Sequence, residues 1–201
     1  MAWFTDPGFF GDERDIYNAA IIAVGEEALT EDSDGSTKAE ILCVNRYPKI
    51  RDAILRAHPW NCALARASLT LNSTPTPVWG FEYQYDLPSD PDDWCLKVVR
   101  MSEDGAIYKI EGRLLLTDES PAEIRYVKRI TDIDLFDNLL FEAIAAYLAS
   151  VLAFPITKSR SLMGDMFGIY KDKMKEARRV DGLETGYSDT VGANLWLESR
   201  L

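Results

Sequence analysis

Hydrophobic residues near the start of the chain recur every three to four positions, the spacing of one face of a helix. This pattern predicts a first helix over residues 12–24 and a second that opens at a Thr37–Glu40 capping box. The second helix should end near His58, because Pro59 disfavours helical geometry in the residue before it. The apolar face of this second helix is expected to hold Ile41, Val44, Tyr47, Ile50, Ile54 and Leu55.

From Ser68 the apolar period falls to two, which is typical of strands. Residues 79–87 alternate aromatic and polar side chains, and further strands are predicted over about 95–101, 107–110, 114–116 and 124–130. A turn at Gly112–Arg113 is expected to join the strand over 107–110 to the strand over 114–116. Asp104–Gly105 has the sequence of a tight hairpin turn. Residues 68–130 therefore predict a compact antiparallel β segment.

Helical spacing returns at Asp134, a predicted N-cap, and continues to Phe154, where Pro155 is expected to end the helix. Residues 135–154 are long and apolar enough to cross a membrane, but the polar residues within them favour a buried helix in a bundle. A fourth helix is predicted over 159–180. Its inner face should hold Leu162, Met166, Phe167, Ile169, Tyr170 and Met174.

These elements predict an α+β fold: a helical bundle of about four helices with an inserted antiparallel β segment and an extended C-terminal tail. The expected divisions are an N-terminal helical part (1–67), the β insertion (68–132), a C-terminal helical part of the same bundle (133–180) and the tail (181–201).

The chain has 201 residues and a net charge of −11, which argues against a protein whose main role is to grip nucleic-acid phosphates. That balance is compatible with a protein that lets DNA pass without holding it. Cys43, Cys62 and Cys95 are odd in number and widely spaced, so reduced thiols are expected rather than a disulfide framework or a zinc site. The N-terminus lacks the basic and apolar regions of a secretory signal.

No catalytic motif stands out, and no enzyme activity, metal or cofactor is predicted. His58, the one histidine, is interpreted as a structural hydrogen-bonding residue at a helix end. An acidic run could in principle hold calcium, but a solvated acidic loop is the favoured interpretation. That run comprises Glu82, Asp86, Asp90, Asp92 and Asp93.

The alternating aromatic residues of 79–87 permit two interpretations. Exposed, they would form a stacking platform for sugars or bases. Buried, they would form one inward face of a sheet, which is favoured because aromatic side chains bury large areas. The residues concerned are Trp79, Phe81, Tyr83 and Tyr85, with Leu87 at the end of the run.

Charge is distributed unevenly along the chain. Residues 1–40 contain ten acids and two bases, whereas residues 46–66 contain five bases and one acid. We interpret this as an acidic end of one subunit that meets a basic face of its neighbour, although each charge could also be an ordinary solvated one. The candidate interface with a neighbouring subunit or another partner comprises Arg46, Lys49, Arg51, Arg56, Arg66, Lys171, Lys175, Arg178 and Arg179. The tail is expected to dock on a partner through Leu195, Trp196 and Leu197.

Several sequence blocks resemble the tail tubular protein A family, the head-to-tail adaptors of short-tailed, T7-like bacteriophages. The resemblance extends over about residues 12–201, and its motifs are structural, so their weight comes from their number and order. The blocks are Tyr47–Asn61, Ala65–Leu69, Phe81–Pro88, Ile110–Thr117, Ile124–Asp132, Leu135–Asp137 and Ala153–Thr157. One departure is the acid-rich loop over 31–36, which leaves the portal-facing surface unassigned.

The resemblance implies a helical bundle with a β extension and a structural virion protein at the head–tail junction, made in the host cytoplasm. It implies a homo-oligomeric ring of about twelve copies that binds the portal protein and a tail nozzle similar to tail tubular protein B. Double-stranded DNA would pass through the ring during packaging and ejection, and no membrane is involved. The family offers no catalytic residues to carry over. The alternative is a carbohydrate- or nucleic-acid-binding module that uses the aromatic strand face.

Overall fold

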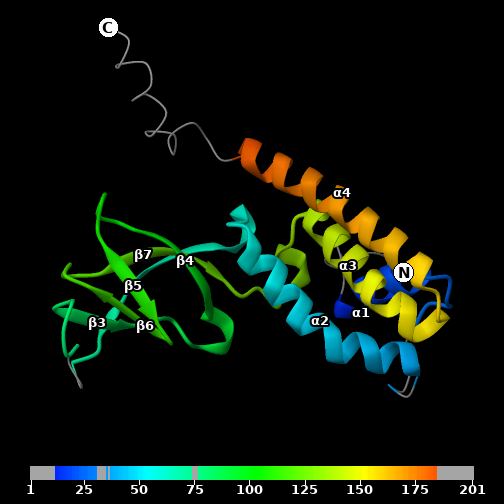
Figure 1. Ribbon diagram of the computed structural model, residues 1–201, viewed down its shortest axis with the longest axis horizontal. Helices are drawn as coiled ribbons and strands as arrows, with labels where there is room; N and C mark the ends of the chain where they lie inside the picture. Colours follow the sequence, from blue (N-terminus) through cyan, green and yellow to red (C-terminus); the bar gives the residue numbers. More distant parts are fainter. Residues whose placement is uncertain (1–11, 31–34, 36, 74–76, 185–201) are drawn as a thin grey trace, which may run out of the picture.

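The computed structural model describes residues 12–30, 35, 37–73 and 77–184. Two bodies lie along the long axis of the molecule, a helical body and a β body (Figure 1). The helical body contains α1 (Glu13–Ala23), α2 (Lys38–Ala57), α3 (Asn138–Thr157) and α4 (Arg160–Glu184). The predicted α+β class is confirmed, because the β strands are inserted between α2 and α3.

The first two helices begin as their sequences predict. Asp12 caps α1, where its side chain accepts a 2.7 Å hydrogen bond from the Arg14 amide. Thr37 caps α2 by accepting a 3.2 Å hydrogen bond from the amide of Glu40. A side-chain acceptor at this position satisfies an amide that has no partner within the helix.

Two helix ends differ from their predictions. Asp137, not Asp134, caps α3, and its carboxylate accepts hydrogen bonds from the amides of Leu139 and Leu140. Asp134 instead lies in a short 3₁₀ turn, Ile133–Leu135. The prediction that Pro155 ends the helix is also wrong, because α3 continues to Thr157. A proline within a helix removes one backbone hydrogen bond, and near the end of α3 the helix continues past it for two residues.

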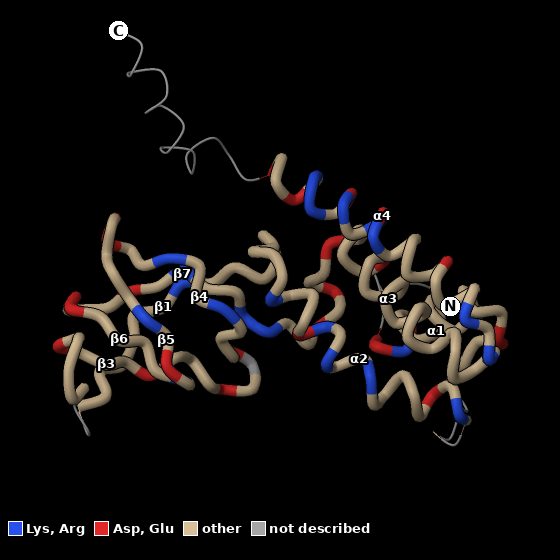
Figure 2. The backbone as a smooth tube through the Cα atoms, viewed as in Figure 1, with Lys and Arg blue, Asp and Glu red and all other residues tan. Residues whose placement is uncertain are grey.

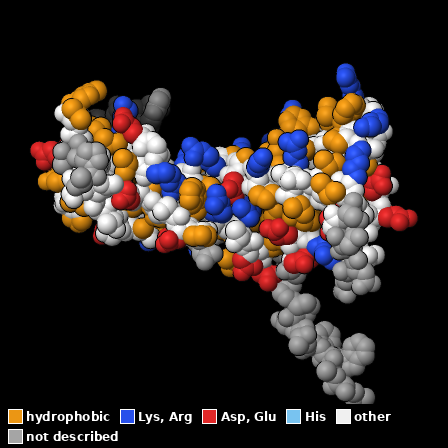
Figure 3. Space-filling model, turned by 90° about the horizontal axis from the view of Figure 1, so that it is seen from below, with side chains coloured by type: hydrophobic (Ala, Val, Ile, Leu, Met, Phe, Trp, Pro, Cys, Tyr) orange, Lys and Arg blue, Asp and Glu red, His pale blue; other side chains and the backbone are white. Residues whose placement is uncertain are grey.

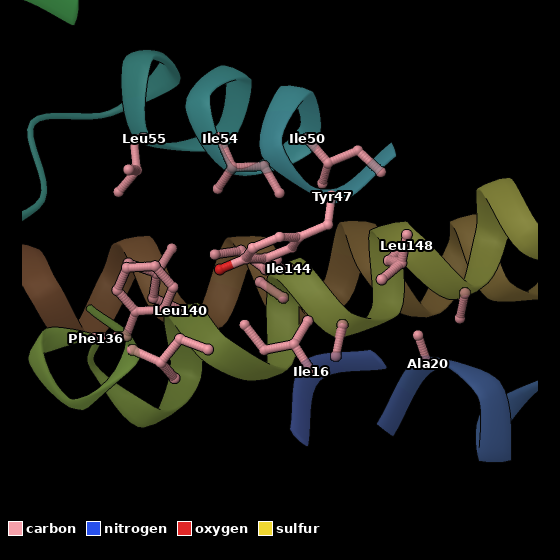
Figure 4. Packing of buried hydrophobic residues seen from close by; sticks show 14 of the residues in the cluster. Ile16, Ala20, Tyr47, Ile50, Ile54, Leu55, Phe136, Leu140, Ile144 and Leu148 are labelled. Carbon is pink, nitrogen blue, oxygen red and sulfur yellow. The ribbon is translucent and has the colours of Figure 1, made fainter. Parts of the chain in front are cut away.

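Helix α3 forms the centre of the helical body, as predicted for a buried helix. Its buried side chains pack against α1, α2 and α4, which lie around it (Figures 1 and 4). Within the described residues α3 is the one helix long and apolar enough to cross a membrane, and 56% of that apolar window is buried inside the molecule. Its buried residues include Leu140, Ile144, Leu148 and Leu152.

Two predicted helix faces are wrong in part. Ile41 and Val44 on α2 are exposed, and Cys43 is buried in their place. On α4, Phe167 and Ile169 are also exposed, because α4 lies against the bundle on only one side. Helix α4 runs to Glu184, so residues 181–184 belong to this helix and not to the expected tail.

The β body is a sandwich of two antiparallel sheets. Sheet A has the strand order β1–β7–β4, and sheet B has the order β2–β3–β6–β5. Their inner faces enclose a second core that includes Tyr85, Leu115, Ile124 and Tyr126. The strands are β1 (Leu64–Ser68), β2 (Thr70–Leu71), β3 (Tyr83–Asp86), β4 (Cys95–Met101), β5 (Tyr108–Glu111), β6 (Leu114–Thr117) and β7 (Glu123–Lys128).

The predicted hairpin at Asp104–Gly105 is wrong in its pairing. Gly105 has φ of 85°, a turn conformation, but the strands on either side belong to different sheets. The turn therefore carries the chain from β4 in sheet A to β5 in sheet B. The neighbouring hairpin, β5 to β6 around Gly112, has the predicted pairing.

Candidate interaction surfaces

His58 makes a structural contact at the end of α2. Its Nε2 lies 2.9 Å from Oδ2 of Asp181 on α4, and its ring packs edge-on against Trp60. Asp181 also accepts a 2.8 Å hydrogen bond from the Asn61 amide and, through its carbonyl, a 2.7 Å bond from the Asn61 side chain. The buried Asp181 therefore fastens the last turns of α4 to the connection between α2 and β1, and His58 has the hydrogen-bonding role predicted for it.

Arg51 differs from the other predicted interface residues because it is buried, with a relative exposure of 6%. It pairs with Asp52 at 2.9 Å and lies 3.9 Å from Glu13 on α1. Arg51 is therefore an internal residue, and its inclusion in the interface is wrong. The sequence held a signal for this, since Arg51 follows the buried Tyr47 by four positions and precedes the buried Ile54 by three.

The remaining basic residues of this group have different environments. Arg46 and Lys49 are exposed on α2, and Arg66 is exposed on β1. Arg56 is also exposed, but its guanidinium donates a hydrogen bond to the carbonyl of Leu96 on β4 and so joins the two bodies. All four residues are therefore exposed, and Arg56 differs from Arg46, Lys49 and Arg66 by its hydrogen bond to β4.

The outer side of α4 combines cations with apolar side chains, and we call it the α4 surface. Its predicted members Lys171, Lys175, Arg178 and Arg179 are all exposed. Phe167, with 40% exposure, lies beneath the Lys171 ammonium, which is 4.7 Å from the ring centroid. Phe167, Tyr170, Lys171, Met174, Lys175 and Arg178 line a shallow hollow of about 410 Å³. A partner could bury apolar area here within a rim of positive charge.

The aromatic stripe of residues 79–87 is divided between core and surface. Tyr85 is buried between the sheets, as the favoured interpretation predicts, and Tyr83 and Phe81 are half-buried. For Trp79 that interpretation is wrong, because β3 begins only at Tyr83 and Trp79 lies before it with 84% exposure. Pro77 and Gly80, the latter with φ of 95°, interrupt the extended strand.

Trp79 and its neighbour Val78 form an exposed apolar group before β3, which we call the β tip. Val78 is 95% exposed. The segment containing Val78 and Trp79 lines a hollow of about 300 Å³ on sheet B together with Lys109 and Leu116. Fully exposed apolar side chains of this size are typical of surfaces that contact a partner.

The acidic loop contributes to the fold of the β body. The Asp93 carboxylate accepts a 2.5 Å hydrogen bond from the hydroxyl of Tyr126, and these contacts and burial raise the pKa of the Tyr126 hydroxyl. Among the described residues no group of three or more His, Cys, Asp or Glu side chains is placed to hold a metal ion.

The three cysteines lie in separate places. Cys43 is buried in the helical body and Cys95 in the β body, while Cys62 is half-buried at the junction. Burial raises the pKa of Cys43 to about 12 and that of Cys62 to about 11. A raised pKa keeps these thiols protonated and unreactive at neutral pH.

Strand pairing brings together three arginines that the sequence analysis did not connect. Arg66 on β1 lies directly opposite Arg125 on β7, which is paired with Arg100 on β4. All three line one hollow of about 340 Å³ on the outer side of sheet A, together with Ser68, Ser102 and Glu123. We call this site the arginine groove. Nothing in the local sequence reveals it, because the order of strands in a sheet is set by the tertiary fold.

The tail-docking residues Leu195, Trp196 and Leu197 lie outside the described residues. The chain was also compared with protein-family models and with curated proteins, and neither comparison finds a match.

Proposed function

We propose that this protein is a structural virion component, a head-to-tail adaptor that forms a ring between the portal and the tail nozzle of a short-tailed bacteriophage. The sequence blocks that resemble the tail tubular protein A family suggest this role. Twelve or so copies around the DNA channel would follow from the same resemblance. The protein would act by binding, with no chemical step.

The structural observation that carries the proposal is the separation of two exposed apolar surfaces on one elongated subunit. The β tip lies at the end of the β body, whereas the α4 surface lies on the helical body (Figure 1). Trp79 is 84% exposed on the first, and Met163 and Phe167 are 41% and 40% exposed on the second. Two unlike surfaces on one subunit suit head-to-tail contacts, which close into a ring when the rotation between neighbours is right.

The connection between the two bodies supports a rigid building block. Asp52 on α2 pairs with Arg129 at 2.8 Å, and the Arg129 guanidinium stacks on Trp94, 4.9 Å from the ring centroid. Arg113 covers the same indole at 4.3 Å. Because these contacts hold the β body against α2, a ring built from such subunits would have a defined diameter.

The charge of the chain supports passage of DNA rather than tight binding. A net charge of −11 per copy makes a ring of this protein strongly negative. A negative channel makes few contacts with DNA phosphates, and such contacts would slow the passage of the duplex. The cations of the α4 surface then serve contacts to a neighbouring copy or to the portal.

The test is to mix purified protein with portal protein and to measure the mass of the product by native mass spectrometry. The proposal expects a portal complex that carries a ring of about twelve copies. A protein that stays monomeric in the presence of portal contradicts it. A monomer in the absence of portal is still compatible with assembly on the portal template.

The alternative, a module that binds carbohydrate or single-stranded nucleic acid, is favoured by one observation, the exposure of Trp79. It has less support than the adaptor, because Tyr85 of the same stripe is buried and cannot stack on a ligand. Titration of tryptophan fluorescence with an oligosaccharide and with single-stranded DNA separates the two. A saturable change that is lost in Trp79→Ala supports the module.

A further inference from the structure

We infer that the arginine groove is a receptor for carboxylates, and that it takes the acid-rich segment 25–36 of a second copy of this chain. The inference rests on the proposed function, since it assigns one of the contacts between neighbouring copies in the ring. Its starting observation is the row Arg66, Arg125 and Arg100 across three adjacent strands.

The row has an electrostatic cost that an anion can offset. Directly opposite residues on antiparallel strands have their Cβ atoms about 5 Å apart, and like charges at such positions destabilise the sheet. Arg100 lies 3.9 Å from Asp104, an exposed residue of the following turn. Arg66 makes no ion pair within the part of the chain that the structure describes. Guanidinium groups that line one hollow are suited to hold carboxylates in bidentate pairs.

The positive charge is concentrated on sheet A. Its strands carry five bases, Arg66, Lys97, Arg100, Arg125 and Lys128, and one acid, Glu123. The strands of sheet B carry one base, Lys109, and two acids, Asp86 and Glu111. Lys and Arg accordingly follow β4, β7 and α2 in Figure 2, and basic side chains gather between the two bodies on the face seen in Figure 3.

The complementary charge lies at the start of the helical body. Residues 25–36 contain five acids, Glu26, Glu27, Glu31, Asp32 and Asp34, and no base. Glu26 and Glu27 are exposed. This segment is therefore the part of the chain with the clearest charge complementarity to the groove.

The segment cannot reach the groove of its own copy. On one side Thr30 accepts a 3.1 Å hydrogen bond from Arg14, and on the other Thr37 caps α2. The six residues between these two points can extend outwards by about 10 Å before the chain must return. The groove lies beyond the other end of α2, a helix of 20 residues that is about 30 Å long. A second copy must therefore supply the carboxylates.

Nucleic-acid phosphate is the less favoured occupant. The chain has a net charge of −11, and Glu123 lines the groove beside the arginines. A duplex carries closely spaced negative charges along its whole length, so the net negative charge of the chain repels it more than it repels a short segment with five acids.

The test uses the full chain and a labelled peptide of residues 25–36, with binding followed by fluorescence anisotropy. We expect saturable binding that weakens as salt is added, and a loss of at least about tenfold in affinity for Arg66→Glu, since one charge-assisted contact is worth that much. Arg66→Lys should retain part of the affinity. The matched control is Lys109→Glu on sheet B, which should bind as the unaltered chain does, and a peptide with glutamine and asparagine in place of its acids should not bind.

Three results would overturn the inference: no binding of the acidic peptide, equal binding by Arg66→Glu and Lys109→Glu, or Arg66-dependent binding of a labelled DNA duplex without binding of the peptide. If Arg66→Glu does not fold, as judged by circular dichroism, Arg100→Gln replaces it. Failure of the groove is distinguishable from failure of the adaptor. If Arg66→Glu still forms rings on the portal, the groove is not a contact within the ring, but the adaptor function stands. If the unaltered chain binds the acidic peptide but never joins a portal, the groove binds carboxylates and the adaptor function is wrong.

Discussion

Asp52 on α2 and Arg129, which follows β7, form an ion pair at 2.8 Å that joins the helical body to the β body. Asp52 also pairs with the buried Arg51, so one carboxylate satisfies two guanidinium groups from different parts of the chain. The relative orientation of the two bodies therefore depends on a polar contact as well as on apolar packing.

We predict that Asp52→Asn lowers the free energy of unfolding by about 2 kcal/mol, because it removes the nearer carboxylate of the buried Arg51 and the ion-pair partner of Arg129. Urea unfolding followed by circular dichroism measures the change. Asp165→Asn, an exposed substitution on α4, serves as the matched control and should have little effect. An Asp52→Asn protein as stable as the control would show that the pair contributes nothing to the joint.

Asp181 offers a second, local prediction. Asp181→Ala removes the acceptor for the Asn61 amide and for His58, so we expect a loss of about 2 kcal/mol and faster amide hydrogen exchange in the last turns of α4. Hydrogen exchange with mass spectrometry reads out each segment. Exchange that rises equally throughout the molecule, with no emphasis on the end of α4, would contradict the fastening role.

The buried thiols predict how stability depends on pH. The pKa of Cys43 is raised to about 12. Above pH 9 the unfolded chain loses this proton first, so the folded state binds more protons and stability falls as pH rises. We expect a loss of about 1.5 kcal/mol between pH 8 and pH 9.7 for a thiol buried as Cys43 is.

Urea unfolding at pH 8, 9 and 9.7 tests this prediction, and Cys43→Ala is the control that should show a shallower decline. Tyr17 and Tyr47 are also buried with raised pKa values, so they would add their own loss of stability above the ordinary pKa of tyrosine. The pH range is therefore kept below that pKa. Equal slopes for the two proteins would exclude Cys43 as a source of the effect.

Much of the helical body could be predicted from the sequence because its determinants are local. Thr37 and Glu40 are adjacent on the first turn of α2, so their cap can be read from four residues. The pairing of β4 could not be read in this way. A turn sequence at Asp104–Gly105 specifies a reversal of the chain, but it does not specify which sheet the next strand joins. That choice depends on packing within the core of the β body, which includes Tyr126 and Leu115.

The candidate surfaces also differ in whether local sequence or the tertiary fold determines them. Exposure of Lys171 and Arg178 follows from their positions on a helix with one buried face, so the sequence predicts it. Arg66 and Arg125 are neighbours only through strand pairing, which no local pattern encodes. Arg51 shows the opposite error, since its charge predicts an exposed side chain although it lies on the buried face of α2.

Trp79 provides a prediction that separates stability from assembly. Because it is 84% exposed, Trp79→Ala should change the free energy of unfolding by less than about 0.5 kcal/mol. If the β tip contacts a neighbour, the same change should weaken assembly at least tenfold, as an aromatic anchor at an interface does. Sedimentation velocity with portal present measures assembly, and Leu135→Ala, another exposed apolar residue, is the control. Assembly that tolerates Trp79→Ala would remove the β tip from the interface.

The proposed function requires that copies of this chain close into a ring around a channel. Negative-stain electron microscopy of the protein mixed with portal shows whether such a ring forms. We expect annular particles in which a layer of this protein caps one end of the portal around an open bore. Portal particles without such a layer, beside free globular monomers, would contradict it.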